Sequence, residues 1–397
     1  MHNVFLGVYM RYFFYASLFF IISCSQTREA PDDKANGCIS DNVSLTSSFT
    51  TGRMDECVQI ENNHFLITLK PENEPINNSP WYAFKAQSQV EKTIKVTIAV
   101  SGDRANRYLP KFSYDKHTWH TLTDYQQEER LSFSIPVSTT PIYIAAQEII
   151  DNDYYVNWAN KLSLLYKTKV DILGYSSQNR PIYKIQTGDE NKEWVVVLGR
   201  LHPPEVTGAL ALFPFVENLL SGTELAQRFR DKYNLLVIPN LNPDGVALGN
   251  WRHNANGFDL NRDWITLAQP ETKLVHNYLQ ELAKKGHKVK FALDFHSTKH
   301  DVFYTMPVDY GVADKYFVKH WLANLDAATA DFTVVQKPGN KPNNGVSKQY
   351  FADNYAVHAV TYEMGDETNR DKITKVALKA SETLMQTILS NTDHDKE

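Results

Sequence analysis

Residues 194–205 read Trp-Val-Val-Val-Leu-Gly-Arg-Leu-His-Pro-Pro-Glu, an apolar run that ends in a histidine and a glutamate. A continuous apolar run is typical of a strand that is buried on both faces of a parallel sheet. Three further runs have the same character and lead into polar residues, at 235–238, 289–295 and 357–362. Because ligands bind at the carboxyl ends of the strands in open α/β sheets, we expect the four polar segments to meet at one edge of the sheet.

Helical patterns lie between these runs, at Thr207–Leu220 and Glu271–Lys285, and Pro270 stands where a helix start prefers proline. The alternation of strands and helices predicts an α/β domain over residues 150–397, with a mixed, largely parallel sheet flanked by helices. Upstream, over residues 38–149, short alternating segments are separated by turn residues. This pattern predicts a small antiparallel β-sandwich.

The N-terminus has the features of an export signal. Arg11 precedes an apolar run at 12–22, which has the length of a signal-peptide core and is short for a membrane span. We therefore predict a signal peptide at 1–23. Ile21-Ile22-Ser23-Cys24 resembles a bacterial lipobox, which predicts a lipid on Cys24, a polar tether at 24–37 and a lipoprotein anchored on the periplasmic or cell-surface side. The alternative is an ordinary signal peptide, or a weak anchor, with a chance cysteine.

Two further cysteines, Cys38 and Cys57, follow the predicted tether. An exported chain meets an oxidising compartment, so we expect a disulfide between them; two separate buried thiols are the alternative. The whole chain carries 41 basic and 46 acidic residues, a formal net charge of -5. No segment forms a basic stripe, so nucleic acid is not an expected partner.

His202 and Glu205 stand three residues apart, a spacing that lets an imidazole and a carboxylate bind one ion. Pro203-Pro204 between them exclude the helical form of such a motif. His296, after a later apolar run, supplies a third ligand. Two histidines and one glutamate, with a fourth position open for water, are the donor set of a catalytic zinc site, so we predict one Zn²⁺ per chain. The alternative for His202 is an ordinary surface-loop histidine.

Three polar residues of the segment 252–262 suit a substrate that ends in a carboxylate, because guanidinium groups bind carboxylates bidentately. They are Arg252, Asn261 and Arg262. Surface salt bridges are the alternative for the two arginines. Glu363 follows an apolar run and, beside a metal, would accept a proton from water; a salt bridge at the sheet edge with Arg370 or Lys372 is the alternative.

Taken in order, these motifs resemble the zinc carboxypeptidase family typified by pancreatic carboxypeptidase A. The matching residues are His202-x-x-Glu205, Asn242-Pro243-Asp244-Gly245, Arg252, Asp259-Leu260-Asn261-Arg262, His296-Ser297 and Thr361-Tyr362-Glu363. The resemblance covers roughly residues 150–390. The β-rich part with Trp81-Tyr82-Ala83-Phe84 is similar to the small domain that precedes the catalytic domain in the cytosolic-carboxypeptidase branch, here in exported lipoprotein form.

The resemblance implies a metallocarboxypeptidase that removes C-terminal residues from peptides with a free terminal carboxylate. It also implies a role for each matching residue. His202, Glu205 and His296 would hold zinc, Asp259 would orient His202, Asn261 and Arg262 would bind the terminal carboxylate, Arg252 would stabilise the oxyanion, and Glu363 would act as general base and then acid. Lys348 falls near the position that sets side-chain preference in the family, which favours acidic C-terminal residues or cell-wall peptides; a solvated lysine is the alternative.

Two departures from the family pattern concern substrate closure. Residues 336–342 contain no tyrosine where family members carry a mobile one, and the nearby Tyr350 and Tyr355 are interpreted as core residues. Thr298 stands where well-studied members have tyrosine.

Two other functions are alternatives. A deacylase of the aspartoacylase type would use the same zinc ligands, but its β-domain would follow the catalytic part. A lipid-anchored binding protein, in which the β-domain binds the ligand, would not need the zinc ligands or Glu363.

Overall fold

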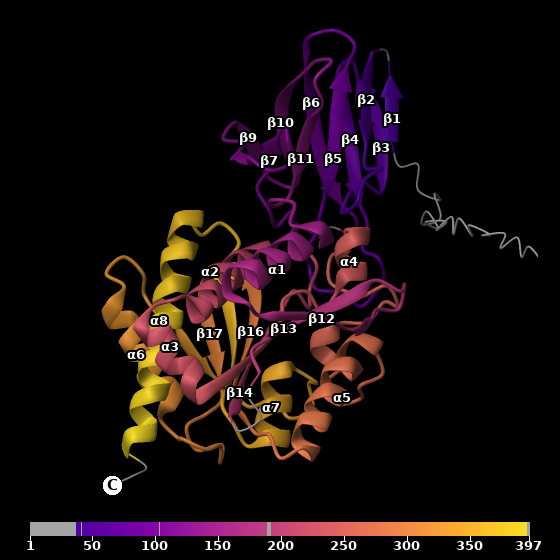
Figure 1. The fold of residues 1–397 in the computed structure, drawn as a ribbon. Helices are drawn as coiled ribbons and strands as arrows, with labels where there is room; N and C mark the ends of the chain where they lie inside the picture. The colour runs from indigo at the N-terminus through magenta and orange to yellow at the C-terminus, as the bar shows by residue number, and fades with distance from the viewer. Residues whose placement is uncertain (1–36, 41, 103, 189–191, 395–397) are drawn as a thin grey trace, which may run out of the picture. The chain divides into compact units, whose positions relative to one another are not determined.

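The computed structural model describes residues 37–40, 42–102, 104–188 and 192–394 (Figure 1). The predicted signal peptide and Cys24 lie outside the described residues. The described residues form one compact unit. Within the described part of the chain, every helix is too short or too polar to cross a membrane.

The N-terminal part is a sandwich of two sheets. The first contains β1 (Gly37–Ser40), β2 (Val43–Thr46), β5 (Ala83–Ser88), β11 (Ile142–Ala145), β7 (Lys111–Ser113) and β8 (His120–Thr121), in that order. The second contains β3 (Glu56–Glu61), β4 (His64–Leu69), β6 (Lys92–Val100), β10 (Leu131–Val137) and β9 (Tyr125–Gln127). Alternate residues along β10 are buried, which explains the alternating pattern in the sequence.

The predicted antiparallel β-sandwich is confirmed with one local difference, since β4 and β6 run parallel. The chain passes from β4 through β5, which belongs to the opposite sheet, before it returns to β6. Two crossings between the sheets bring β6 back in the direction of β4. The alternation of side chains reports which face of a strand is buried and is silent on the direction of its neighbour.

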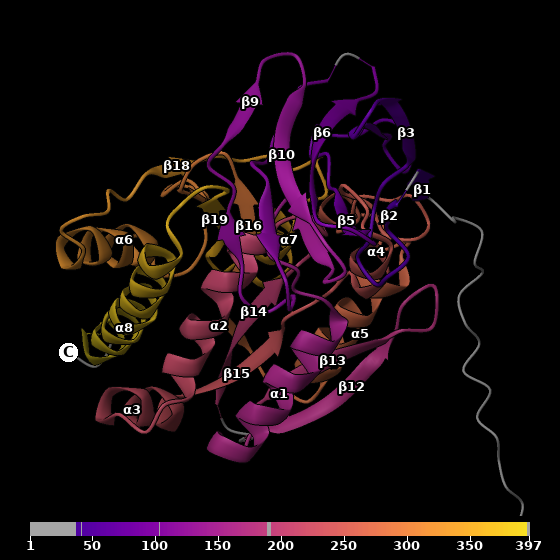
Figure 2. The same ribbon diagram turned by 90° about the horizontal axis from the view of Figure 1, so that it is seen from above.

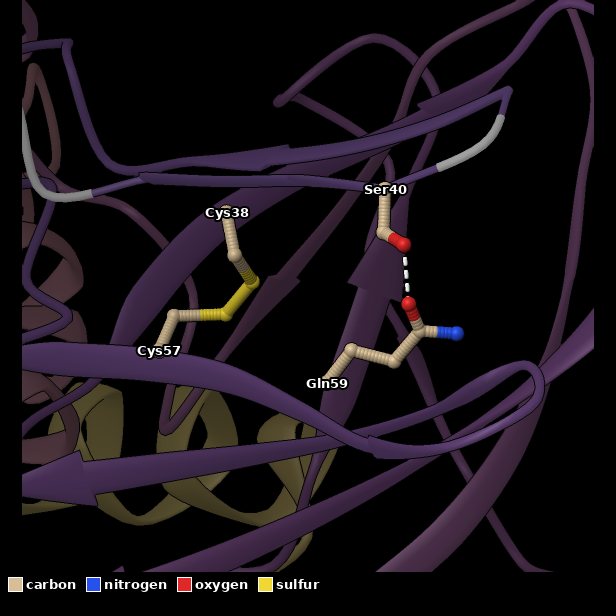
Figure 3. Close-up of a disulfide and its surroundings, with 4 residues drawn as sticks. All are labelled: Cys38, Ser40, Cys57 and Gln59. Carbon is tan, nitrogen blue, oxygen red and sulfur yellow. Dashed lines mark hydrogen bonds between the residues drawn. A yellow bond between two sulfur atoms is a disulfide. The ribbon is translucent and has the colours of Figure 1, made fainter.

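The disulfide predicted between Cys38 and Cys57 is present (Figure 3). Cys38 lies on β1 and Cys57 on β3, so the bond joins the edge strands of the two sheets. Ser40 donates a hydrogen bond to Gln59 between the same two strands. The disulfide therefore ties the first described strand to the body of the sandwich.

The second part is built on an eight-stranded sheet. Its strands, in order, are β12 (Lys169–Tyr175), β13 (Pro181–Gln186), β15 (Tyr233–Ile238), β14 (Glu193–Gly199), β16 (Val289–Thr298), β19 (Ala359–Gly365), β17 (Val302–Thr305) and β18 (Gln336–Pro338). The central strands β15, β14, β16 and β19 are parallel. The pairs β12–β13, β13–β15 and β17–β19 are antiparallel, and the edge strand β18 is parallel to β17. The predicted mixed, largely parallel α/β fold is confirmed.

Helices cover both faces of this sheet (Figures 1 and 2). One face carries α2 (Val206–Leu220), α3 (Glu224–Lys232), α6 (Phe317–Ala328) and α8 (Arg370–His394). The other carries α5 (Pro270–Lys284) and α7 (Ser347–Tyr355). The remaining helices, α1 (Asn152–Tyr166) and α4 (Pro243–Leu248), pack against each other. An apolar core fills each interface between sheet and helices.

Candidate metal centre and cleft

The three predicted metal ligands lie together at the carboxyl end of the central strands. His202 and Glu205 belong to the loop between β14 and α2, where Pro203-Pro204 delay the helix until Val206. His296 lies near the end of β16 and inside the strand, whereas the sequence placed it after the strand. One ligand atom from each residue lies within 4.8 Å of the others, and all three residues are buried.

The Glu205 carboxylate lies between the two imidazole rings. Its two oxygens lie 2.7 Å from Nδ1 of His202 and 2.6 Å from Nδ1 of His296. Burial alone would raise the pKa of Glu205, but the two imidazoles hold it well below its ordinary value. Two Nδ1 atoms and a carboxylate that converge in a buried cluster fit a divalent cation, and this donor set is typical of zinc. His202, Glu205 and His296 are therefore the residues that would hold it.

A second carboxylate contacts the outer nitrogen of each imidazole. Asp259 Oδ1 lies 2.9 Å from Nε2 of His202, the contact expected from the resemblance. Asp294 Oδ2 lies 2.8 Å from Nε2 of His296. Such partners fix the orientation and basicity of the ligand histidines. Asp294 was not predicted from the sequence, although its position two residues before His296 in a strand places both side chains on one face.

Helix α2 packs closely on β16 and fixes the position of the His296 backbone. A Cβ atom on Gly208 would lie 2.4 Å from the carbonyl oxygen of His296, so only glycine allows this approach. Thr207 Oγ1 and the Gly208 amide also donate to Ser297 Oγ, both at 2.8 Å.

Glu363 lies inside β19, opposite His296 in the parallel ladder, so both side chains leave the sheet on the same face. Glu363 is half-buried, and its enclosed Oε2 has no hydrogen-bond partner within the described residues. Burial, reinforced by the charge of Glu205, raises its pKa to about 7. The alternative salt bridges are absent from the described structure, because Arg370 pairs with Glu148 and Lys372 lies near Asp331.

These groups open into one cleft of about 490 Å³. Arg252, Asn261 and Arg262 line it together with the three metal-ligand candidates and Glu363. Arg252 Nε donates to Asp259 at 2.7 Å, and Asn261 Oδ1 accepts from the Ser347 amide at 2.9 Å. The site thus combines three candidate metal ligands, the Glu363 carboxylate and the guanidinium groups of Arg252 and Arg262.

Lys348 also lines the cleft, and it is buried. Its Nζ donates to the carbonyl oxygens of Thr305, at 3.1 Å, and Gly339, at 2.5 Å. Among the described residues, no carboxylate forms an ion pair with it. Burial lowers its pKa to about 8. The alternative of a solvated lysine is therefore wrong.

The tyrosines near the site divide between core and cleft. Tyr350, on α7, is buried, and its hydroxyl contacts His276. Tyr355, the last residue of α7, packs on the same core, as expected. Tyr304, which the sequence analysis did not single out, lines the cleft with Thr298. It pairs with Thr361 in the β17–β19 ladder, two residues from the partner of Glu363. Tyr304 could have been found from its position in the strand segment that follows His296 in the sequence.

The β-sandwich also reaches this site, which the sequence did not indicate. Asn77 and Arg107 from its loops line the cleft. Glu72 accepts hydrogen bonds from the backbone of the segment that carries Arg252. These residues carry no motif, and they lie far in sequence from the groups that they meet.

Comparison with known proteins agrees with this geometry. Residues 155–387, more than half of the chain, match the zinc carboxypeptidase family. The chain belongs to that family. Residues 45–146 match the cytosolic carboxypeptidase N-terminal domain, so the β-sandwich has its counterpart in this branch of the zinc carboxypeptidases.

Among curated relatives, cytosolic carboxypeptidase 3 of Mus musculus is 24% identical over 294 residues, which cover 64% of this chain and 29% of that protein. Cytosolic carboxypeptidase 6 of Mus musculus is 30% identical over 158 residues, covering 37% and 29%. The chain therefore spans less than a third of the length of these relatives.

Solved structures share the complete two-part fold. The metallo-carboxypeptidase from Burkholderia cenocepacia has a TM-score of 0.75 at 18% identity, covering 88% of this chain and 99% of that one. The metallo-carboxypeptidase from Pseudomonas aeruginosa, in complex with (2-guanidinoethylmercapto)succinic acid, has a TM-score of 0.69 at 18% identity, covering 87% and 98%. At this level of identity the likeness concerns the fold.

Proposed function

We propose that this chain is a zinc metallocarboxypeptidase that removes single residues from the free C-terminus of peptides. The observation that carries the proposal is the buried His202–Glu205–His296 cluster, which shares one cleft with Glu363, Arg252 and Arg262. This arrangement unites a metal site, a carboxylate whose pKa of about 7 suits a general base at neutral pH, and groups that can bind a substrate carboxylate.

Each group has a task in peptide hydrolysis. His202, Glu205 and His296 would hold zinc, which would supply Lewis-acid activation of water and of the scissile carbonyl group. Glu363 accepts the proton of the attacking water and returns it to the leaving amine. Arg252 stabilises the negative charge that develops on the carbonyl oxygen, because its guanidinium is held in place by Asp259 before the reaction.

Asn261 and Arg262 bind the terminal carboxylate, which restricts cleavage to the chain end. To test this, two peptides identical except for a free or amidated C-terminus should be compared by mass spectrometry. We expect cleavage of the free acid alone, and a large rise in KM for the free acid in Arg262→Met. Equal cleavage of the amide would reject the exopeptidase proposal.

Lys348 supports a preference for acidic C-terminal residues, in proteins or in cell-wall peptides. A buried ammonium group that is bonded only to neutral acceptors leaves its charge available to a substrate carboxylate. Lys348→Met should therefore lower kcat/KM for glutamate-ended peptides about tenfold or more relative to leucine-ended ones. Lys184→Met, which removes a buried lysine outside the cleft, serves as control. An unchanged ratio in Lys348→Met would exclude this role.

The same preference should depend on pH. The pKa of Lys348 is lowered to about 8 from 10.5, so the side chain is charged below pH 8 and becomes neutral as the pH rises above it. The kcat/KM ratio of glutamate-ended to glutamine-ended peptides should accordingly fall between pH 7 and pH 9, and should be flat in Lys348→Met. A ratio constant to pH 10 would contradict the assignment.

We further propose that the protein is exported and anchored through a lipid on Cys24. The disulfide supports export, because such bonds persist mainly in oxidising compartments. In a bacterial host, Cys24→Ser should move the protein from the membrane fraction to the soluble exported fraction and abolish incorporation of labelled fatty acid. Membrane retention of the variant would show that the cysteine is not the anchor.

A further inference from the structure

Several charged side chains of the β-sandwich contact the α/β domain, and one of them, Arg107, also lines the cleft. Arg107, in the loop between β6 and β7, is nearly enclosed, with 10% of its side chain exposed. Its Nε and Nη2 donate to the two carboxylate oxygens of Asp366, at 2.8 and 3.0 Å. Nη2 also donates to the carbonyl oxygen of Ser297 at 3.2 Å, and Nη1 donates to Ser79 within the sandwich at 2.6 Å.

The two groups that Arg107 joins are the ends of neighbouring strands. Ser297 follows His296 in β16, and Asp366 directly follows β19, three residues after Glu363. The Asp366 amide donates to the carbonyl oxygen of Thr298 at 2.8 Å, which continues the ladder between the strands. Arg107 therefore closes the ladder at the point where His296 and Glu363 face each other.

Glu72 makes a second contact between the domains, with the segment that carries Arg252. Its carboxylate accepts the backbone N–H groups of Trp251, Arg252 and His253, at 2.9, 2.9 and 2.8 Å. Burial alone would raise the pKa of Glu72, but His253 and these amides lower it to about 2. The carboxylate stays charged and holds the turn that presents Arg252 to Asp259.

We propose that Arg107 and Glu72 are positioning residues of the active site, so that the β-sandwich is a working part of it. Arg107 fixes the separation of His296 and Glu363, and Glu72 fixes the direction of Arg252. The inference rests on the proposed function. A bidentate ion pair that is closed off from water sets a geometry that lysine or water cannot reproduce, and a misplacement of about 1 Å at a reacting group costs about 100-fold in rate.

The same interface offers a matched control. Lys111, a buried cation on β7, lies 3.4 Å from Glu367, the residue after Asp366. It belongs to the same domain contact but touches neither strand end and does not line the cleft. Lys111→Gln should lower the melting temperature as Arg107→Gln does and leave kcat unchanged.

The test compares Arg107→Gln, Asp366→Asn, their double variant and Glu72→Gln in the full chain, by kcat, KM, zinc content and melting temperature. We expect kcat to fall about 10- to 100-fold in each single variant, with KM within about twofold and zinc retained. Because Arg107 and Asp366 act through one contact, the double variant should lose little more than either single variant. Full kcat in Asp366→Asn, or losses that multiply in the double variant, would overturn the proposal for Arg107. Full kcat in Glu72→Gln would overturn it for Glu72.

A second readout does not depend on activity. In Arg107→Gln and Asp366→Asn, hydrogen exchange at 296–299 and 363–367 should accelerate while the rest of the sheet is unchanged, and Lys111→Gln should leave these segments as in the wild type. Unchanged hydrogen exchange would overturn the proposal for Arg107, whether or not the wild type cleaves peptides. A wild type that cleaves no peptide would reject the proposed function and would leave the exchange test of Arg107 valid. If Arg107→Gln does not fold, Asp366→Asn decides alone.

Discussion

Replacing Glu363 with glutamine is expected to lower kcat roughly a thousandfold, with zinc content and KM close to those of the wild type. The substitution preserves the shape of a side chain whose Oε2 has no hydrogen-bond partner among the described residues, so it removes a base and little else. Glu367→Gln, four residues further on and partly exposed, is the control and should retain activity. Steady-state kinetics on one peptide series measure both. A variant with more than about a tenth of wild-type kcat would exclude Glu363 as the base.

In the metal-free protein, Glu363→Gln should also change how the free energy of unfolding depends on pH. The pKa of Glu363 is raised from 4.5 to about 7, chiefly by burial, so the folded state disfavours the charged form. The wild type should therefore lose stability relative to Glu363→Gln as the pH rises from 4.5 to about 7, and the two should be similar below 4.5. Urea unfolding at a series of pH values tests the sign. A wild type that gains stability relative to the variant over this range would contradict it.

Loss of Glu205 should abolish both zinc binding and activity. Its two oxygens lie against the Nδ1 atoms of both histidines, so no other side chain of the cluster replaces it. Glu205→Ala should purify without zinc and remain inactive when zinc is added after chelation, whereas the wild type recovers. Asp294→Asn, which removes the partner of His296 Nε2, should weaken zinc binding about 10- to 100-fold and leave the site fillable.

Competition with a chelating dye measures these affinities. Zinc affinity should fall from wild type to Asp294→Asn to Glu205→Ala. Glu205 would contact the zinc directly, whereas Asp294 acts on it through His296. Zinc binding by Glu205→Ala equal to that of the wild type would contradict the metal centre described above.

The candidate metal ligands and the candidate base were predictable because they follow long apolar runs. His202, Glu205, His296 and Glu363 each stand where a buried strand reaches the edge of the sheet, and topology brings those edges together. The exact ends of the strands were less predictable, since β16 and β19 extend through His296 and Glu363. A polar residue that faces a cleft interrupts the apolar pattern without ending the strand.

The contribution of the β-sandwich was not predictable. Arg107 contacts Asp366 across a sequence separation of 259 residues, and Glu72 contacts the Arg252 segment across about 180. Neither residue lies in a motif, and a loop arginine or glutamate is usually exposed. Only the folded arrangement of the two domains gives these side chains their partners. The parallel pairing of β4 and β6 escaped prediction for a related reason, because it depends on a route through the opposite sheet.

The most direct test of the proposed carboxypeptidase activity is a mass-spectrometric time course of the zinc-loaded protein with free-acid peptides that differ only in their last residue. If the protein has this activity, we expect a ladder of products that each lack one further C-terminal residue, absent in Glu363→Gln and after chelation of zinc. Internal cleavage, or no shortening of any peptide by a protein that retains stoichiometric zinc, would contradict it.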